Sequence, residues 1–178
     1  MKHYLLLICL LFSFNCFAQE IQSDTEENGI RRIATGFITD GDILYTGTWA
    51  YAVQATKSKT LGTNYTMGIV ITGVNKDLLP EKPGILVRFF NDDEVLRLNA
   101  VSVMDIYHKD CAAMIVLTIT EQQLARFKNG LTKIRVETKN NYVQHEYEQD
   151  ECGALIYQAY ANIKQRFSQL RKTFADGF

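Results

Sequence analysis

The 178-residue sequence has little of what marks several protein classes. It contains only two prolines and no internal repeat or low-complexity tract, so it is neither a fibrous nor a repeat protein. Neither sign of charge dominates, because the sequence has 19 Lys and Arg and 20 Asp and Glu, for a formal net charge of −1. This balance argues against a nucleic-acid partner, since dedicated nucleic-acid binders carry a basic excess. The length and the 47% of hydrophobic residues predict one globular domain.

A single apolar run near the start of the chain predicts a secretory signal peptide. Lys2 precedes a nearly unbroken apolar run over residues 4–14, and Ala18 and Cys16 occupy the −1 and −3 positions of a cleavage site. The alternative is a retained anchor, but the run is too short to span a bilayer comfortably, and no second run follows it. We therefore expect residues 1–18 to be removed. The mature chain would be periplasmic or secreted, with no transmembrane segment after cleavage.

The chain has four cysteines, and the predicted signal peptide contains two of them. The other two, Cys111 and Cys152, are a candidate disulfide, because exported chains enter an oxidising compartment. Such a bridge would close a loop of about forty residues and stabilise the fold by about 4 kcal/mol in the entropic model. The alternative is a pair of unlinked buried thiols that pack as small hydrophobic groups. Both alternatives stay open, because the sequence does not place the two Cα atoms within bonding range.

The remaining chain predicts a short tail followed by one α+β domain. Residues 19–29 contain four acids and one apolar residue, so we expect them to be disordered. Residues 30–178 should form an α+β domain with a mainly antiparallel sheet, flat or curled, of about seven or eight strands, with a short and a long helix packed on it. The runs that predict strands are residues 30–39, 48–56, 65–74, 85–90, 94–103, 112–120, 133–139 and 142–148. The run over residues 133–139 alternates most cleanly, so we expect Ile134, Val136 and Thr138 to face inward and Lys133, Arg135, Glu137 and Lys139 to face outward.

Two segments have the pattern of helices. Glu121–Lys128 follows Thr120, a good N-cap, and stops before Asn129-Gly130. In Asp150–Phe174 apolar residues recur at steps of three and four and form one continuous stripe. The stripe consists of Leu155, Ile156, Ala159, Tyr160, Ile163, Phe167, Leu170 and Phe174. We expect this stripe to pack on the sheet.

Two stretches, ILVRFFNDDEVLRL and LTITEQQLARFKNGLTKIRVET, carry a resemblance to a known type of protein. The chain resembles small, uncharacterised exported bacterial domains over residues 85–163. In these domains a strand–turn–strand precedes a short helix, a "K-I-R-V-E" strand and a terminal helix. The residues that carry the likeness are Thr120, Glu121, Gln122, Gly130, Lys133, Ile134, Arg135, Val136 and Glu137. The resemblance implies an α+β fold and brings no catalytic residue.

No complete pattern for catalysis, metal or cofactor binding occurs in the sequence. The densest polar set is His108-Lys109-Asp110-Cys111, which distant His145 could join. Zinc sites use sharper spacings than this, and no P-loop, G-x-G-x-x-G or G-x-S-x-G is present, so we expect no metal or cofactor. A Cys–His hydrolase stays open as an alternative, with Cys111 or Cys152 beside a histidine.

Aromatic residues on the predicted strands have two interpretations. Trp49, Tyr51 and Tyr65 could be exposed and bind a partner, or they could pack in the core, as aromatic residues in strands more often do. The sequence thus favours an exported non-catalytic domain that binds a protein or a cell-envelope component. One alternative is a secreted or periplasmic hydrolase that uses the His108/Asp110 region. Another is a periplasmic inhibitor or small-ligand carrier.

The signal-peptide prediction can be tested directly. N-terminal sequencing of exported material should begin at Gln19, because cleavage follows Ala18. Exported protein that still begins at Met1 would contradict the prediction.

Overall fold

A computed structural model describes residues 20–39, 48–73, 84–91, 94–107, 112–147 and 151–175. The predicted signal peptide lies outside these residues. Ten strands form a single sheet in which every pairing between neighbours is antiparallel. The strands are β1 (Ile21–Glu27), β2 (Ile30–Thr35), β3 (Ile38–Thr39), β4 (Trp49–Ser58), β5 (Gly62–Ile71), β6 (Leu86–Phe90), β7 (Val95–Tyr107), β8 (Ala112–Ile119), β9 (Lys133–Glu137) and β10 (Tyr142–Glu146). A sheet with packed helices is confirmed, with more strands than the sequence predicts.

The strand β1 lies in the segment that the composition predicts to be disordered. It pairs with β2 through a two-residue turn in which Asn28 and Gly29 have φ of 53° and 72°. Positive φ at both positions is the geometry of the tight turn that suits twisted hairpins. The Asp24 carboxylate then accepts hydrogen bonds from Arg31, at 2.7 and 2.6 Å, and from Arg166 at 2.8 Å. Polar pairing with distant arginines thus orders a segment that buries little apolar surface.

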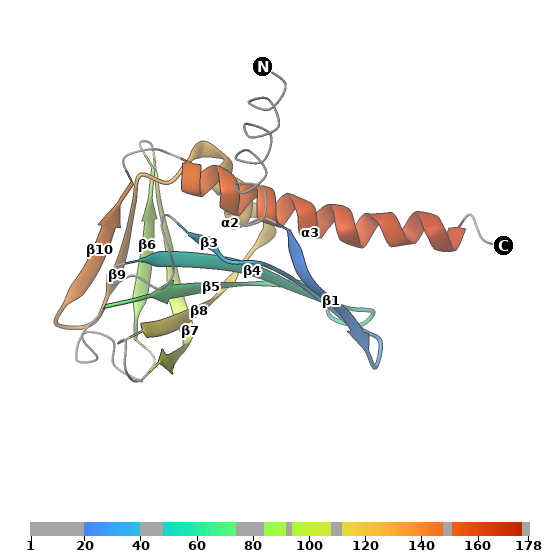
Figure 1. Cartoon of the computed structure of the whole chain (residues 1–178), viewed down its shortest axis with the longest axis horizontal. Coiled ribbons are helices and arrows are strands. Elements are labelled where there is room, and N and C mark those ends of the chain that lie inside the picture. Colours follow the sequence, from blue (N-terminus) through green and yellow to red (C-terminus); the bar gives the residue numbers. More distant parts are fainter. Residues whose placement is uncertain are drawn as a thin grey trace, which may run out of the picture.

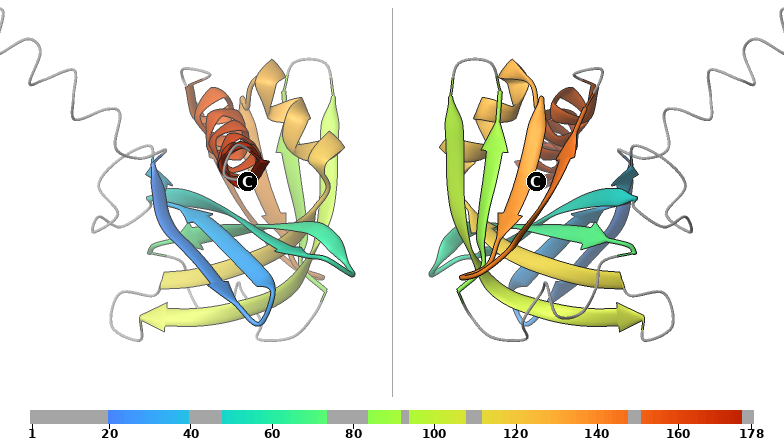
Figure 2. Two further views of the ribbon diagram at one scale, coloured as in Figure 1. Left: turned by 90° about the vertical axis from the view of Figure 1, so that its right-hand side faces the viewer. Right: turned by 90° about the vertical axis from the view of Figure 1, so that its left-hand side faces the viewer.

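The sheet runs in the order β1-β2-β4-β5-β8-β7-β6-β9-β10, and β3 pairs with β4 beside this path. The long strand β7 joins its two parts, because residues 95–99 pair with β6 and residues 100–107 pair with β8. The β7–β8 register shifts at Ala100/Ser102 and again at Asp105/Tyr107, and such irregularities bend a strand. The sheet therefore curls, as Figures 1 and 2 show.

The long helix α3 (Glu151–Ala175) packs on the curled sheet, where it contacts β1–β4. The predicted apolar stripe is confirmed over the described side chains, because Ile156, Ala159, Tyr160, Ile163 and Phe167 are buried and Leu155 packs partly buried against the same core. They join the hydrophobic core formed by the inward residues of the strands, including Tyr51, Ile69 and Leu117.

The short helix α2 (Glu121–Arg126) has Thr120 as its N-cap, as predicted, and continues into the 3-10 helix η3 (Phe127–Asn129). The Thr120 side chain accepts from the Gln123 backbone, and the Gln123 side chain accepts from the Thr120 backbone, so the two form a capping box. Glu121 fastens α2 to α3 by accepting hydrogen bonds from the Tyr160 hydroxyl at 2.6 Å and from Lys164. Burial and this bond to Glu121 raise the pKa of Tyr160 to about 12.

The core contribution of α3 can be tested with a matched pair of variants. Ile163→Asp should lower the free energy of unfolding by about 4 kcal/mol or more, because it places an unpaired charge in the core. Gln165→Asp introduces the same residue on the exposed side of α3 and should change stability little. Urea unfolding of both variants measures the difference, and equal stabilities would contradict the packing described here.

The ion pairs of Asp24 make the β1–β2 hairpin sensitive to acid. The hydrogen bonds from Arg31, followed by those from Arg166, hold the pKa of Asp24 below its ordinary value of 3.8. A lowered folded-state pKa contributes stability above the unfolded-state value, and this contribution is lost as the pH falls through the folded-state value. Asp24→Asn should therefore cost about 2 kcal/mol at neutral pH, and this cost should shrink below pH 3.8. Exposed Glu27→Gln is the control for unfolding measured across this range, and a pH-independent cost of Asp24→Asn would contradict the interpretation.

Candidate binding surface

The structure places the aromatic residues predicted as partner-binding in the core. Trp49, Tyr51 and Tyr65 are all buried, so they present no exposed face to a partner and do not form a binding surface. Instead, Tyr65 packs edge-on against Tyr160 of α3, with ring centroids 5.6 Å apart. The core interpretation of these three residues therefore replaces the binding interpretation.

Trp49 and Tyr51 join β4 to the far end of the curled sheet. The Trp49 ring stacks on His145 of β10 with centroids 5.9 Å apart, and His145 meets the Tyr147 ring edge-on at 4.7 Å. The hydroxyls of Tyr51 and Tyr147 form a hydrogen bond. We call these four residues the aromatic clasp, because they hold β10 against the opposite side of the core.

The structure describes only some of the residues that the sequence suggests for a hydrolase, a metal site or a disulfide. His108, Asp110 and Cys111 lie outside the described residues, so the hydrolase and the disulfide stay predictions. Cys152 is buried in the first turn of α3. The described parts of the chain contain no group of three or more His, Cys, Asp or Glu side chains that could hold a metal ion. Among the same residues, no helix has the length and apolar character needed to cross a membrane.

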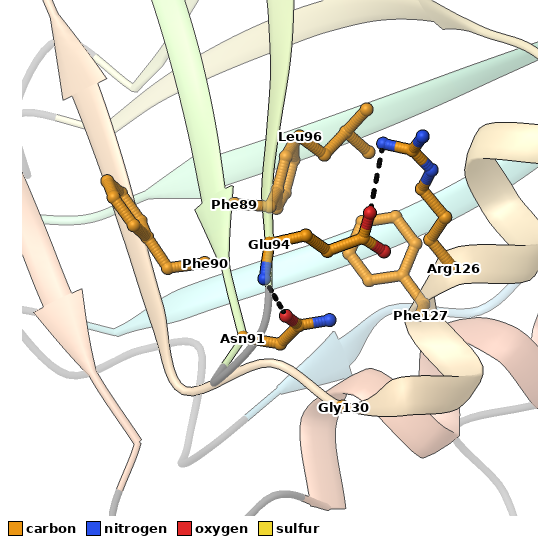
Figure 3. Close-up of a pocket in the computed structure, with 8 residues that line it drawn as sticks. All are labelled: Phe89, Phe90, Asn91, Glu94, Leu96, Arg126, Phe127 and Gly130. Carbon is orange, nitrogen blue, oxygen red and sulfur yellow. Dashed lines mark hydrogen bonds and ion pairs between the residues drawn. The ribbon is translucent and has the colours of Figure 1, made fainter.

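A small pocket lies between the β6–β7 turn and η3 (Figure 3). Arg126 closes one side through an ion pair with Glu94 at 3.3 Å, and the Glu94 backbone donates to the Asn91 side chain at 2.7 Å. Its volume is about 20 Å³, which is room for one water molecule. This pocket is therefore too small for a substrate.

The outer face of β6, β9, β10 and the first part of β7 has a more unusual arrangement. Arg88 of β6 lies directly opposite Arg97 of β7 on one side and directly opposite Arg135 of β9 on the other. Directly paired residues point to the same face, and neighbouring strands lie about 4.8 Å apart, so the three arginines form a row across the strands. The right-hand view of Figure 2 looks onto these strands, with α3 behind them.

We call this surface the arginine face. Its outward residues are Leu86, Arg88, Phe90, Val95, Arg97, Asn99, Lys133, Arg135, Glu137, Tyr142, Gln144 and Glu146. Four cations and two carboxylates give it a net charge of +2, although the whole chain has a net charge of −1.

The arginines are only partly compensated by their neighbours. Glu137 contacts Arg88 at 2.8 Å and Arg135 at 3.8 Å, and Arg135 also donates to the Gln144 side chain at 3.1 and 2.8 Å. Arg97 forms no ion pair with any residue that the structure describes. The buried Nε of Arg88 finds no acceptor there either. Like charges directly opposite one another destabilise a sheet, so this row has an energetic cost in the isolated chain.

Exposed apolar groups accompany the charges. Tyr142 is 57% exposed and Val95 is 37% exposed on the arginine face, and Val101, which is 57% exposed, lies beside it on β7. The Arg135 guanidinium lies over the Tyr142 ring, 4.5 Å from its centroid. Arginine and tyrosine are enriched among the residues that dominate protein interfaces.

Sequence reasoning identified only part of this surface. The alternation in residues 133–139 correctly predicts that Lys133, Arg135 and Glu137 face outward. It does not bring Arg88 and Arg97 beside them, because the pairing of β6 with β9 joins segments far apart in the sequence. The signal that could have found the row was the single arginine in each of the two predicted strands over residues 85–90 and 94–103, Arg88 and Arg97.

Comparison with known proteins found no matching family model, no similar curated protein and no similar solved structure.

Proposed function

We propose that the protein is an exported, non-catalytic domain that binds a protein or a cell-envelope component through the arginine face. The observation that carries the proposal is the row formed by Arg97, Arg88 and Arg135 across three neighbouring strands. Export rests on the signal peptide that the sequence predicts in residues 1–18.

The electrostatics of the row favour an acidic partner. Mutual repulsion of the arginines costs stability in the free chain, and carboxylates or other anions on a partner would remove this repulsion. Guanidinium groups bind planar anions through paired hydrogen bonds, which adds specificity to the attraction. Exposed Tyr142 and Val95 add apolar contact area to the arginine face, which the arginine row alone would not provide.

No observation on the described residues favours the hydrolase or the inhibitor and small-ligand carrier over this proposal. The hydrolase depends on His108 and Asp110, which lie outside these residues. The described pocket beside η3 holds about 20 Å³ and supports no carrier role.

A charge reversal on the arginine face tests the proposal. The experiment captures material from the native envelope fraction on immobilised protein. Arg97→Glu should reduce the captured amount of a specific component about tenfold or more, because it places an opposite charge within the row. Arg97 has no ion pair among the described residues, so the fold should tolerate the change.

Arg32→Glu is the matched control, because Arg32 is an exposed arginine on β2, away from the arginine face. It should leave capture unchanged, and high salt should weaken capture by the wild type. Equal loss in both variants would indicate a nonspecific charge effect. Unchanged capture with Arg97→Glu would end the proposal.

A further inference from the structure

We propose that the partner supplies an extended acidic peptide segment, which adds as a strand to the outer edge of β10 beside the arginine face. This inference rests on the proposed function and names the partner class and the binding mode. Strand addition to an exposed sheet edge obtains affinity from main-chain hydrogen bonds and specificity from the neighbouring side chains.

The strands at the two ends of the strand order, β1 and β10, differ in their protection. Natural edge strands resist unwanted pairing through bulges, charges and covering elements. β1 has all three, because its register shifts between Ile21 and Ser23, it exposes Glu26 and Glu27, and Arg166 of α3 binds its Asp24. This edge is therefore blocked.

Among the described residues, the edge of β10 has neither a bulge nor a covering element. Its five residues pair with β9 in unbroken register, contain no proline and include one charged residue, Glu146. No strand among the described residues pairs with its other side. The edge is thus the open end of the sheet as the structure describes it.

The hydrogen-bond pattern shows which β10 groups face outward. Backbone bonds join Thr138 to Asn141 and Thr132 to Tyr147 at the two ends of the β9–β10 pair. Because bonded and non-bonded pairs alternate in antiparallel strands, the backbone groups of Tyr142, Gln144 and Glu146 point away from β9. An incoming strand can pair with these three residues without disturbing the existing sheet.

The charge of Arg135 favours carboxylates on the part of an added strand that lies beside Tyr142 and Gln144, whereas Glu146 does not favour them at the other end of β10. Arg135 extends from β9 toward this edge, because it contacts both the Gln144 side chain and the Tyr142 ring on β10. Carboxylates on an added strand would come within reach of Arg135 and place negative charge at the end of the arginine row. A second copy of this chain is a poorer occupant, since pairing β10 with itself would join two arginine faces of the same sign.

The test compares two variants at one position. Gln144→Pro removes an outward backbone N–H and leaves the bonds to β9 intact, as edge prolines do. Gln144→Ala removes the same side chain, including its bond to Arg135, but keeps the N–H. The probe is a short, alternating peptide of glutamate and threonine, and the same peptide with lysine in place of glutamate is its control. Binding is measured by calorimetry, and circular dichroism checks the fold.

The glutamate peptide should bind Gln144→Pro about fivefold or more weakly than Gln144→Ala, and the lysine peptide should not bind. In the wild type, amide exchange at Tyr142, Gln144 and Glu146 should slow when the glutamate peptide is bound, a measurement that does not depend on the proline variant folding. Equal affinities of the two variants together with unchanged exchange would overturn strand addition.

Three further outcomes would contradict the proposal that the bound partner is an extended acidic peptide. They are binding to vesicles of anionic lipid but not to the peptide, equal binding of both peptides, and dimerisation of the free protein that Gln144→Pro abolishes. Failure of strand addition remains distinct from failure of the proposed function. If Arg97→Glu abolishes capture while the two Gln144 variants behave alike, the partner lies flat on the arginine face.

Discussion

The fold depends on the packing of the α3 stripe against the concave side of a bent sheet. A sheet of this size has one face that must be covered, and the buried residues from Ile156 to Phe167 provide that cover. Gly153 shows how close the approach is, because an added Cβ would lie 2.6 Å from the Gly130 carbonyl carbon and 2.7 Å from the Leu131 nitrogen. The first turn of α3 thus rests directly on the backbone that follows η3. Glu121 then ties α2 to α3 from the solvent side through Tyr160 and Lys164.

Charged side chains gather on the outer side of β6, β9 and β10, because the inward residues of β6 and β9 are apolar and buried in the core. Along β9, Ile134 and Val136 are buried, whereas Lys133, Arg135 and Glu137 lie half-buried on the other side. The period of two fixes which residues share a face, and strand register then decides which of them meet across strands. A shift of β6 by one residue against β9 would turn Arg88 inward and break the row. The arginine face is therefore a consequence of the same register that fills the core.

Local patterns predicted the elements better than they predicted the neighbours. The α3 stripe, the Thr120 cap and the β9 alternation all depend on residues close in sequence, and the structure confirms them. The arginine row depends on the pairing of β6 with β9, which no local pattern encodes. β1 was missed for a similar reason, because its Asp24 is held by Arg166 from the far end of the chain. Its Asn28-Gly29 turn was a local signal, but the acidic composition around it favoured the opposite conclusion.

The aromatic clasp connects the core to the proposed binding edge. Trp49 and Tyr51 would have suggested binding if they were exposed, but both are buried. Trp49 stacks on His145, and the Tyr51 hydroxyl bonds to the Tyr147 hydroxyl. His145 belongs to β10, and its side chain points inward while Gln144 and Glu146 point outward. A strand held from its inner face in this way loses little further freedom when a partner pairs with its outer edge. Because rigid edges bind with a smaller entropic cost, the aromatic clasp would favour the proposed strand addition at β10 without touching the partner.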